Sequence, residues 1–141
     1  MAANLRGKRL LILGGMRFSC EIVRKAKEMG IYTLVADYNK IEDSPGKQIA
    51  DEAVDLSITD VKSVVAFVIS NAIDGVFVGF NDMLLPYYAE ICEKSGLPCY
   101  GTKEQFEILI AKDKYKALCR QFGVPTIPNM TSTMTIFNSR F

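Results

Sequence analysis

Apolar runs and amphipathic stretches alternate along the whole chain. Residues 9–13 read Arg-Leu-Leu-Ile-Leu and end abruptly at two glycines, which predicts a buried parallel strand. In 18–29 the apolar residues recur every three or four positions while Arg, Lys and Glu occupy the other face. That spacing predicts a helix, and Gly30 is a typical terminator. The chain therefore opens with a strand–helix unit.

The same alternation continues to about residue 122. Further strands are predicted at 31–36, 53–58, 76–78 and 97–100, and helices at 61–71, 81–95, 102–110 and 113–122. Strands that alternate with helices predict a Rossmann-like α/β fold, a doubly wound five-stranded parallel sheet with helices on both faces. Ligands of such folds bind beyond the carboxyl ends of the strands, where the strand order reverses.

The amino-acid composition excludes several kinds of catalytic and binding site. The 141 residues include no histidine, which excludes His-based zinc sites and nucleophiles activated by imidazole. Seventeen Lys and Arg against sixteen Asp and Glu leave a net charge of +1, so nucleic acid is not an expected partner. The four cysteines lack metal or redox spacing and are predicted to be reduced, buried and inert.

No targeting or membrane segment is recognisable. The apolar run at 10–13 is far shorter than a signal-peptide core or a membrane span. We therefore expect a soluble, cytoplasmic protein without a membrane partner.

Three loops follow predicted strands and gather the candidate site residues. Gly14-Gly15 lets the backbone approach an anion at the start of the next helix. Asp37 stands roughly twenty residues further on, where NAD-binding folds place a ribose-binding acid. However, residues 14–19 read Gly-Gly-Met-Arg-Phe-Ser, without the dinucleotide fingerprint. NAD binding and a purely structural loop cap are the alternatives for Asp37.

Two further positions carry polar chemistry. Asn81 and Asp82 follow the fourth predicted strand and are either cleft residues or a helix cap. Lys114 lies in Lys112-Asp113-Lys114 at the start of the last predicted helix, where Asp113 is the expected cap. A cation there opposes the helix dipole, so Lys114 either holds a phosphate or is an ordinary surface lysine.

In this order and at these intervals, the motifs resemble the N-terminal region of the ATP-grasp ligases, particularly members similar to the carbamoyl-phosphate synthase large subunit. The resemblance extends from Lys8 to about Pro128. It rests on Leu11-Ile12-Leu13-Gly14-Gly15, Ala50-Asp51-Glu52, Asp74-Gly75-Val76, Gly96-Leu97-Pro98, Lys112-Asp113-Lys114 and Phe122-Gly123-Val124-Pro125.

The resemblance implies roles for particular residues. Substrate binding is implied for Gly14, Gly15, Met16, Arg17, Asp37, Asn81 and Asp82, and contact with a nucleotide phosphate for Lys114. It implies a pre-ATP-grasp domain at 1–101, the helical start of the ATP-grasp region at 102–128, and an irregular tail at 129–141. ATP and Mg are the implied cofactors, with no magnesium ligand and no catalytic residue expected in this chain.

The implied activity is ATP-dependent activation of a carboxylate or bicarbonate as an acyl phosphate, followed by transfer to an amine or similar nucleophile. The expected substrate is a small carboxylate or amino acid. Because most of the ATP-grasp domain would lie after Pro128, we expect these residues to be inactive alone and to need the remaining half in cis or in trans.

The alternative function is a non-catalytic module that binds a small ligand or a partner protein. Apolar side chains near Phe106, Ile110 and Phe122 are expected to be exposed, which would favour a homodimer.

Overall fold

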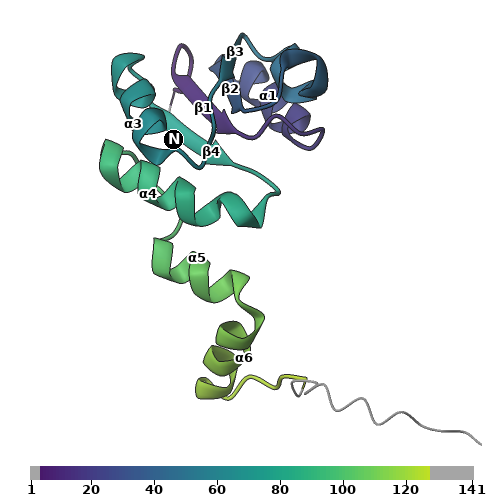
Figure 1. Ribbon diagram of the computed structural model, residues 1–141, viewed down its shortest axis with the longest axis vertical. Coiled ribbons are helices and arrows are strands. Elements are labelled where there is room, and N and C mark those ends of the chain that lie inside the picture. Colours follow the sequence, from purple (N-terminus) through teal and green to yellow (C-terminus); the bar gives the residue numbers. More distant parts are fainter. Residues whose placement is uncertain (1–3, 128–141) are drawn as a thin grey trace, which may run out of the picture. The chain divides into compact units, whose positions relative to one another are not determined.

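Four parallel strands form one sheet in the computed structural model, which describes residues 4–127 (Figure 1). The chain divides into two units, Met1–Glu107 and Ile108–Phe141, and each is described by itself. In the first unit the strands are β1 (Arg9–Leu13), β2 (Tyr32–Asp37), β3 (Glu52–Asp55) and β4 (Gly75–Val78). The helices between and after them are α1 (Ser19–Glu28), α2 (Pro45–Ile49), α3 (Val61–Ser70) and α4 (Leu85–Ser95). Two short 3₁₀ helices, η1 (Ile41–Asp43) and η2 (Asp82–Leu84), complete it.

The spatial order of the strands is β3-β2-β1-β4. The register pairs Leu13 with both Ala36 and Val78, and it pairs Asp37 with Asp55. The carboxyl ends of all four strands therefore meet at one edge of the sheet. The order also reverses at β1, because β2 lies on one side of it and β4 on the other.

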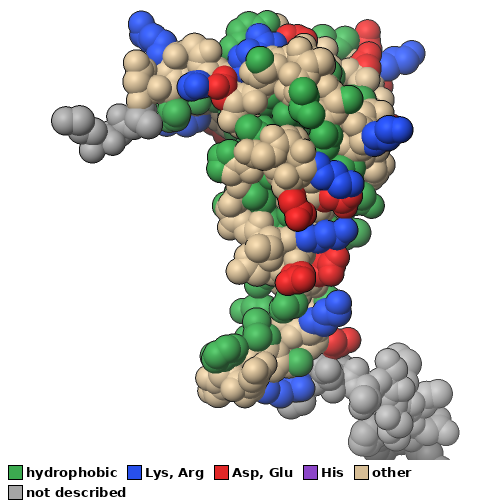
Figure 2. Space-filling view, turned by 90° about the vertical axis from the view of Figure 1, so that its left-hand side faces the viewer, with side chains coloured by type: hydrophobic (Ala, Val, Ile, Leu, Met, Phe, Trp, Pro, Cys, Tyr) green, Lys and Arg blue, Asp and Glu red, His purple; other side chains and the backbone are tan. Residues whose placement is uncertain are grey.

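Helices cover both faces of the sheet, as predicted. Ile12 and Val35 pack with Val23 of α1 and Ile49 of α2. Because side chains alternate along a strand, the neighbouring residues of β1, β2 and β4 point to the opposite face, where α3 and α4 pack together. Their buried side chains there are Val64, Val68, Tyr88, Ile91 and Cys92. Acidic and basic groups are interspersed on the face that Figure 2 shows, in line with the net charge of +1.

The prediction of a fifth strand at 97–100 is wrong. This segment has no regular secondary structure, and its first residue still belongs to the C-terminal cap of α4. Gly96 has a φ of 67°, and the N–H of Leu97 donates to the carbonyl of Cys92 at 2.9 Å. Pro98 lacks the N–H that a ladder would need. The segment contacts β4 through a side chain instead, since the Tyr100 hydroxyl donates to the carbonyl of Val78 at 3.0 Å.

Two predicted helix starts are supported by capping contacts, and two are wrong. Helix α4 begins at Leu85 rather than at 81, because residues 82–84 form the 3₁₀ helix η2. The side chain of Asp60 accepts from the N–H of Ser63 at the start of α3. Thr102 and Gln105 form a reciprocal capping box before α5 (Lys103–Ile110). Helix α6 (Lys112–Gln121), in contrast, begins before Asp113, so this residue lies in the first turn and the N-cap is Ala111.

The described part of the second unit is dominated by α6. None of the residues in this helix is buried. The predicted irregular tail at 129–141 lies outside the described residues. Within residues 4–127, no helix is long and apolar enough to cross a membrane.

Candidate functional site

A cleft of about 270 Å³ opens at the carboxyl ends of the strands, beside the position where the strand order reverses. It is lined by Gly14, Met16, Asp37, Tyr38, Asn39, Ser57, Ile58, Thr59, Asn81 and Leu84. A smaller hollow of about 30 Å³ adjoins it and shares Gly14, Met16 and Asn81. Parallel α/β proteins generally bind their ligands at this position.

The loop after β1 depends on both of its glycines. Gly14 has a φ of 94°, a conformation that other residues adopt only with strain. Gly15 lies against the loop before α2, where a Cβ atom on Gly15 would overlap the hydroxyl of Ser44. The N–H of Gly46 donates to the carbonyl of Gly15 at 2.8 Å. The glycine pair therefore allows two backbone segments to approach closely at the floor of the site.

Asp37 connects this loop to the end of β2. Its side chain is buried, with only 4% of the residue exposed. One carboxylate oxygen accepts from the N–H of Gly15 at 2.7 Å, and the other accepts from the N–H and the side-chain amide of Asn39 at 2.8 and 2.7 Å. The structure thus gives Asp37 the loop-capping role that the sequence left open beside ligand binding.

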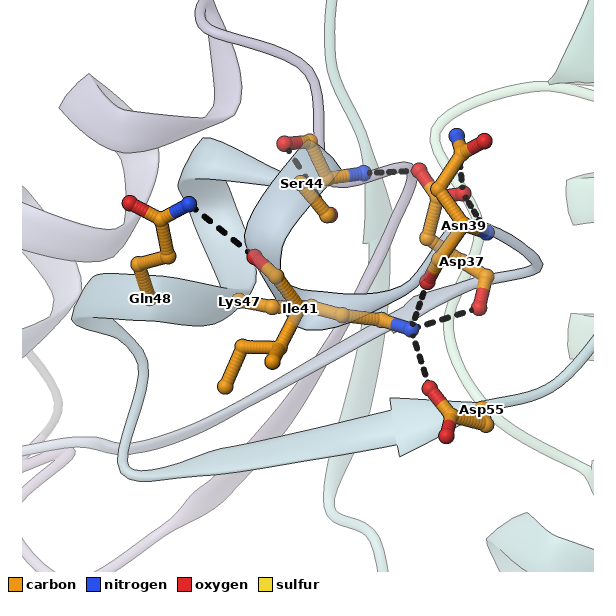
Figure 3. A network of polar contacts seen from close by, with 8 residues as sticks. Asp37, Asn39, Ile41, Ser44, Lys47, Gln48 and Asp55 are labelled. Atoms are coloured by element: carbon orange, nitrogen blue, oxygen red, sulfur yellow. Dashed lines mark hydrogen bonds and ion pairs between the residues drawn. The ribbon is translucent and has the colours of Figure 1, made fainter.

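Lys47 lies underneath the loop that Asp37 begins (Figure 3). Its ammonium donates to the backbone carbonyls of Asp37 and Asn39 at 2.8 and 2.6 Å, and to the carboxylate of Asp55 at 2.6 Å. The Lys47 side chain is fully buried, whereas 84% of the Asp55 side chain is exposed. Lys47 therefore fixes residues 37–39, which form one wall of the cleft, to the end of β3.

The structure does not bring all the predicted site residues together. Gly14, Met16, Asp37 and Asn81 line the cleft, and Gly15 lies behind it. Arg17 lines a separate groove between α1 and α2. Asp82 is exposed in η2 and does not line the cleft, and Lys114 is exposed on α6 in the second unit.

Asn81 does not cap a helix with its side chain. Its backbone carbonyl accepts from the N–H of Leu84 at 3.0 Å, but its side chain makes no capping hydrogen bond. Among the described residues, nothing hydrogen-bonds to the Asn81 amide. This half-buried amide lines both the cleft and the adjoining hollow, with its donors and acceptor available.

Six of the ten residues that line the cleft were not among the predicted site residues. Ser57 and Thr59 were placed inside or just after a strand predicted to run to 58, but β3 ends at Asp55 and both hydroxyls lie in the loop that follows. Lys47 carried no signal, because a lysine in a short polar helix is usually at the surface. The sequence Ser44-Pro45-Gly46 before it indicates a turn. It does not indicate that this turn packs against Gly15 in the loop after β1.

A larger hollow of about 700 Å³ lies beside 97–105. Its lining includes Tyr100, which packs in an aromatic cluster, and Thr102 and Gln105, which already hydrogen-bond to each other's backbone in the capping box. Burial, together with the nearby Cys99, raises the pKa of the Cys92 thiol to about 12. The same cluster buries Tyr88 against the rings of Tyr100 and Phe106. Phe106 is therefore buried, contrary to expectation, whereas Phe122 is 74% exposed, as expected.

The described residues do not fit a magnesium site. Within 4–127, no group of three or more Asp, Glu, Cys or His side chains converges in a way that could hold a metal ion. Asp37, which lines the cleft, is engaged by N–H donors, and Asp55 is engaged by Lys47. No step of the chemistry is therefore assigned to a metal held by these residues.

Comparisons with known proteins agree with this geometry. No protein-family model matches the chain. The 2-oxoglutarate carboxylase small subunit of Hydrogenobacter thermophilus is 26% identical over 130 residues, which cover 86% of this chain and 27% of that protein. The crystal structure of phosphoribosylglycinamide synthetase from Anaerococcus prevotii superposes with a TM-score of 0.70 at 30% identity, over 85% of this chain and 30% of that one.

This chain is related to the N-terminal, pre-ATP-grasp domain of ATP-grasp enzymes. A third relative is the biotin carboxylase domain of the Hydrogenobacter thermophilus 2-oxoglutarate carboxylase, solved in complex with MgADP, ADP and bicarbonate. It superposes with a TM-score of 0.71 at 25% identity, over 86% of this chain and 28% of that one. The pre-ATP-grasp domain described here thus spans less than a third of the length of these relatives.

Proposed function

We propose that this chain supplies the substrate-side N-terminal domain of an ATP-grasp ligase. Such an enzyme activates a carboxylate or bicarbonate as an acyl phosphate and transfers it to an amine or similar nucleophile. One observation carries the proposal: in a domain related to ATP-grasp enzymes, Gly14, Asp37 and Asn81 from three different strand ends converge on one cleft. Residues 1–101 form the substrate-side domain in this proposal, and 102–128 begin the ATP-grasp region.

The proposal gives the predicted residues distinct tasks. Gly14, Met16 and Asn81 contact the substrate, while Gly15 and Asp37 hold the loop that shapes its site. Arg17 and Asp82 lie outside the cleft and contact only parts of the substrate that extend beyond it. ATP supplies the phosphoryl group that activates the carboxylate, and the exposed Lys114 provides a positive charge for a nucleotide phosphate.

Catalysis requires more than these residues. The chain matches 27–30% of the length of its relatives. In the proposal, the ATP-grasp remainder comes from the same polypeptide or from a partner subunit. The relative named as a small subunit supports association with another subunit.

A thermal-shift titration of the chain tests this assignment. The ligands are NAD, MgATP and a panel of small carboxylates and amino acids, because a ligand of the folded state raises the melting temperature. We expect a shift with a member of the substrate panel and none with NAD, since both carboxylate oxygens of Asp37 are already hydrogen-bonded. The shift should disappear in Asn81→Ala. A shift with NAD would overturn the proposal.

A second function, that of an interaction module, is favoured by one observation. Tyr115, Leu118 and Phe122 recur at helical spacing along α6 and the residue after it, and all three are exposed. Sedimentation at increasing concentration tests this function. Self-association that Phe122→Ser abolishes, together with no thermal shift from any ligand, would favour it over the ligase domain.

A further inference from the structure

Three polar side chains meet in the first unit, at the C-terminal end of α4. Tyr88 and Cys92 lie one helical turn apart on the buried face of α4, and Cys99 lies in the segment that follows the helix. The Cys92 thiol shares hydrogen bonds with the Cys99 thiol and with the Tyr88 hydroxyl, and Cys99 shares one with Tyr88. The two sulfur atoms are therefore in direct contact.

The two thiols differ in their access to solvent. Cys92 is completely buried, whereas Cys99 is half-buried and lines the hollow of about 700 Å³ beside 97–105. Cys92 does not line this hollow. The prediction that all four cysteines are buried is therefore wrong for Cys99, and it is also wrong for the half-buried Cys119. A small solute in the hollow meets the Cys99 thiol and not that of Cys92.

We propose that Cys92 and Cys99 form a reversible redox pair, whose two thiols a small peroxide converts to an intramolecular disulfide. The inference goes beyond the proposed function and does not depend on it, because neither cysteine lines the cleft. It assigns a modification site to residues that the sequence predicts to be inert.

The reaction has two steps, written here for hydrogen peroxide. The Cys99 sulfur attacks one peroxide oxygen, the O–O bond breaks, water leaves, and a sulfenic acid remains on Cys99. The Cys92 sulfur then attacks the sulfur of Cys99. This step forms the S–S bond, and the displaced hydroxyl group leaves with the Cys92 proton as a second water. In total the two thiols give up two electrons and two protons, and the peroxide is reduced to two waters.

Exposure and ionisation set the order of these steps. The thiolate is the form of cysteine that attacks peroxide. Burial, together with the contact from Cys99, raises the pKa of the Cys92 thiol to about 12, so almost none of it is thiolate at neutral pH. Cys99 therefore reacts first. The later attack by Cys92 is intramolecular, and the contact between the two sulfurs compensates for the small thiolate fraction.

The segment that carries Cys99 permits the short approach that the bond requires. The sulfurs must move from hydrogen-bonding contact to a separation of about 2.0 Å. Among the described residues, no backbone-to-backbone hydrogen bond holds 98–101. This part of the chain is anchored by the side chain of Tyr100, whose hydroxyl donates to the carbonyl of Val78. Cys99 can thus move towards α4 without breaking a helix or a strand ladder.

Mass spectrometry of the chain before and after treatment with hydrogen peroxide tests the inference. The intact monomer should lose the mass of two hydrogen atoms, and dithiothreitol should restore it. Lys94 lies between the two cysteines, so trypsin separates them into the peptides 63–94 and 95–103. Without reduction these peptides should be recovered as one disulfide-linked pair. This measurement uses the unmodified chain, so it does not depend on the folding of a variant.

Three variants assign the steps. Cys99→Ser should abolish the mass loss. Cys92→Ala should leave Cys99 as a sulfenic acid, which dimedone traps as a covalent adduct. Cys119→Ser is the matched control, because Cys119 is also half-buried but lies on α6 in the second unit, so this variant should form the disulfide like the unmodified chain.

Three results would overturn the inference. They are an unchanged mass of the folded chain under peroxide, a disulfide that joins Cys92 or Cys99 to Cys20 or Cys119, and oxidation of Cys99 to a sulfinic acid while Cys92 stays reduced. None of them bears on the proposed function, which is judged separately by the thermal shifts with NAD and the substrate panel.

Discussion

The N–H of Gly15 donates a 2.7 Å hydrogen bond to the buried carboxylate of Asp37, which joins the loop after β1 to the end of β2. The same carboxylate holds the N–H of Asn39 at 2.8 Å. One side chain therefore fixes two of the loops that form the cleft. Both carboxylate oxygens already accept hydrogen bonds from Gly15 and Asn39. Asp37 therefore shapes the site without needing to contact a ligand.

Replacing Asp37 should destabilise the fold. Asp37→Ala leaves the buried N–H of Gly15 without its acceptor, which costs about 1–3 kcal/mol of unfolding free energy. Urea denaturation measures the change. Asp43→Ala is the control, because Asp43 is exposed in the neighbouring 3₁₀ helix and its replacement should change stability by less than about 0.5 kcal/mol. Equal stability of the two variants would contradict this account of Asp37.

The ion pair between Lys47 and Asp55 should show strong coupling in a double-mutant cycle. Asp55→Asn removes the only carboxylate within residues 4–127 that pairs with the fully buried Lys47 ammonium, so it should destabilise the chain although Asp55 itself is exposed. In the Lys47→Met background the same change should have almost no effect. We expect a coupling of about 0.5–3 kcal/mol from the four urea midpoints. Additive effects of the two substitutions would show that the pair is not coupled.

The close approach at Gly15 predicts a steric effect that Gly96 lacks. In Gly15→Ala the new methyl group overlaps the Ser44 hydroxyl, and Ser44 is buried and cannot move freely. We expect a loss of about 1–3 kcal/mol, typical of overpacking. Gly96→Ala meets no atom within 4 Å and should cost only the strain of its φ of 67°, about 1–2 kcal/mol. The cleft should be lost only in Gly15→Ala, as NMR of the loop amides would show. Unchanged loop amides in that variant would rule out the steric account.

Acid should weaken the fold partly through Asp51. Partial burial opposes its ionisation, but hydrogen bonds from the N–H and hydroxyl of Thr33 and the nearby Lys27 outweigh burial and lower the pKa of Asp51 below its ordinary value of 3.8. Its stabilisation is therefore complete above about pH 4 and is lost as the pH falls through the lowered pKa.

The test compares urea midpoints of the unmodified chain and Asp51→Asn from pH 7 to pH 2.5. The variant should be less stable at pH 7 and should lose less stability on acidification. An acid dependence identical to that of the unmodified chain would mean that Asp51 contributes nothing to it.

The parts of this fold that were predictable are those with a local cause. The apolar run at 9–13 and its glycine stop place β1, and parallel strands necessarily bring their carboxyl ends to one edge. Position 97–100 had the composition of a strand, yet Pro98 and the turn at Gly96 keep it out of the sheet. Lys47 could not be predicted as a buried residue, because its three acceptors come from separate segments that only the tertiary structure brings together.

The claim that this chain carries the substrate-side domain of an ATP-grasp enzyme is tested most directly by ADP formation in a hybrid enzyme. In this hybrid, residues 1–127 replace the matching N-terminal segment of the Hydrogenobacter thermophilus small subunit, to which they are related at 26% identity. We expect the hybrid to form ADP from MgATP in the presence of bicarbonate, Asn81→Ala to slow the reaction, and Asn71→Ala to leave it unchanged. A hybrid that is folded and binds MgADP, yet forms no ADP, would contradict the assignment.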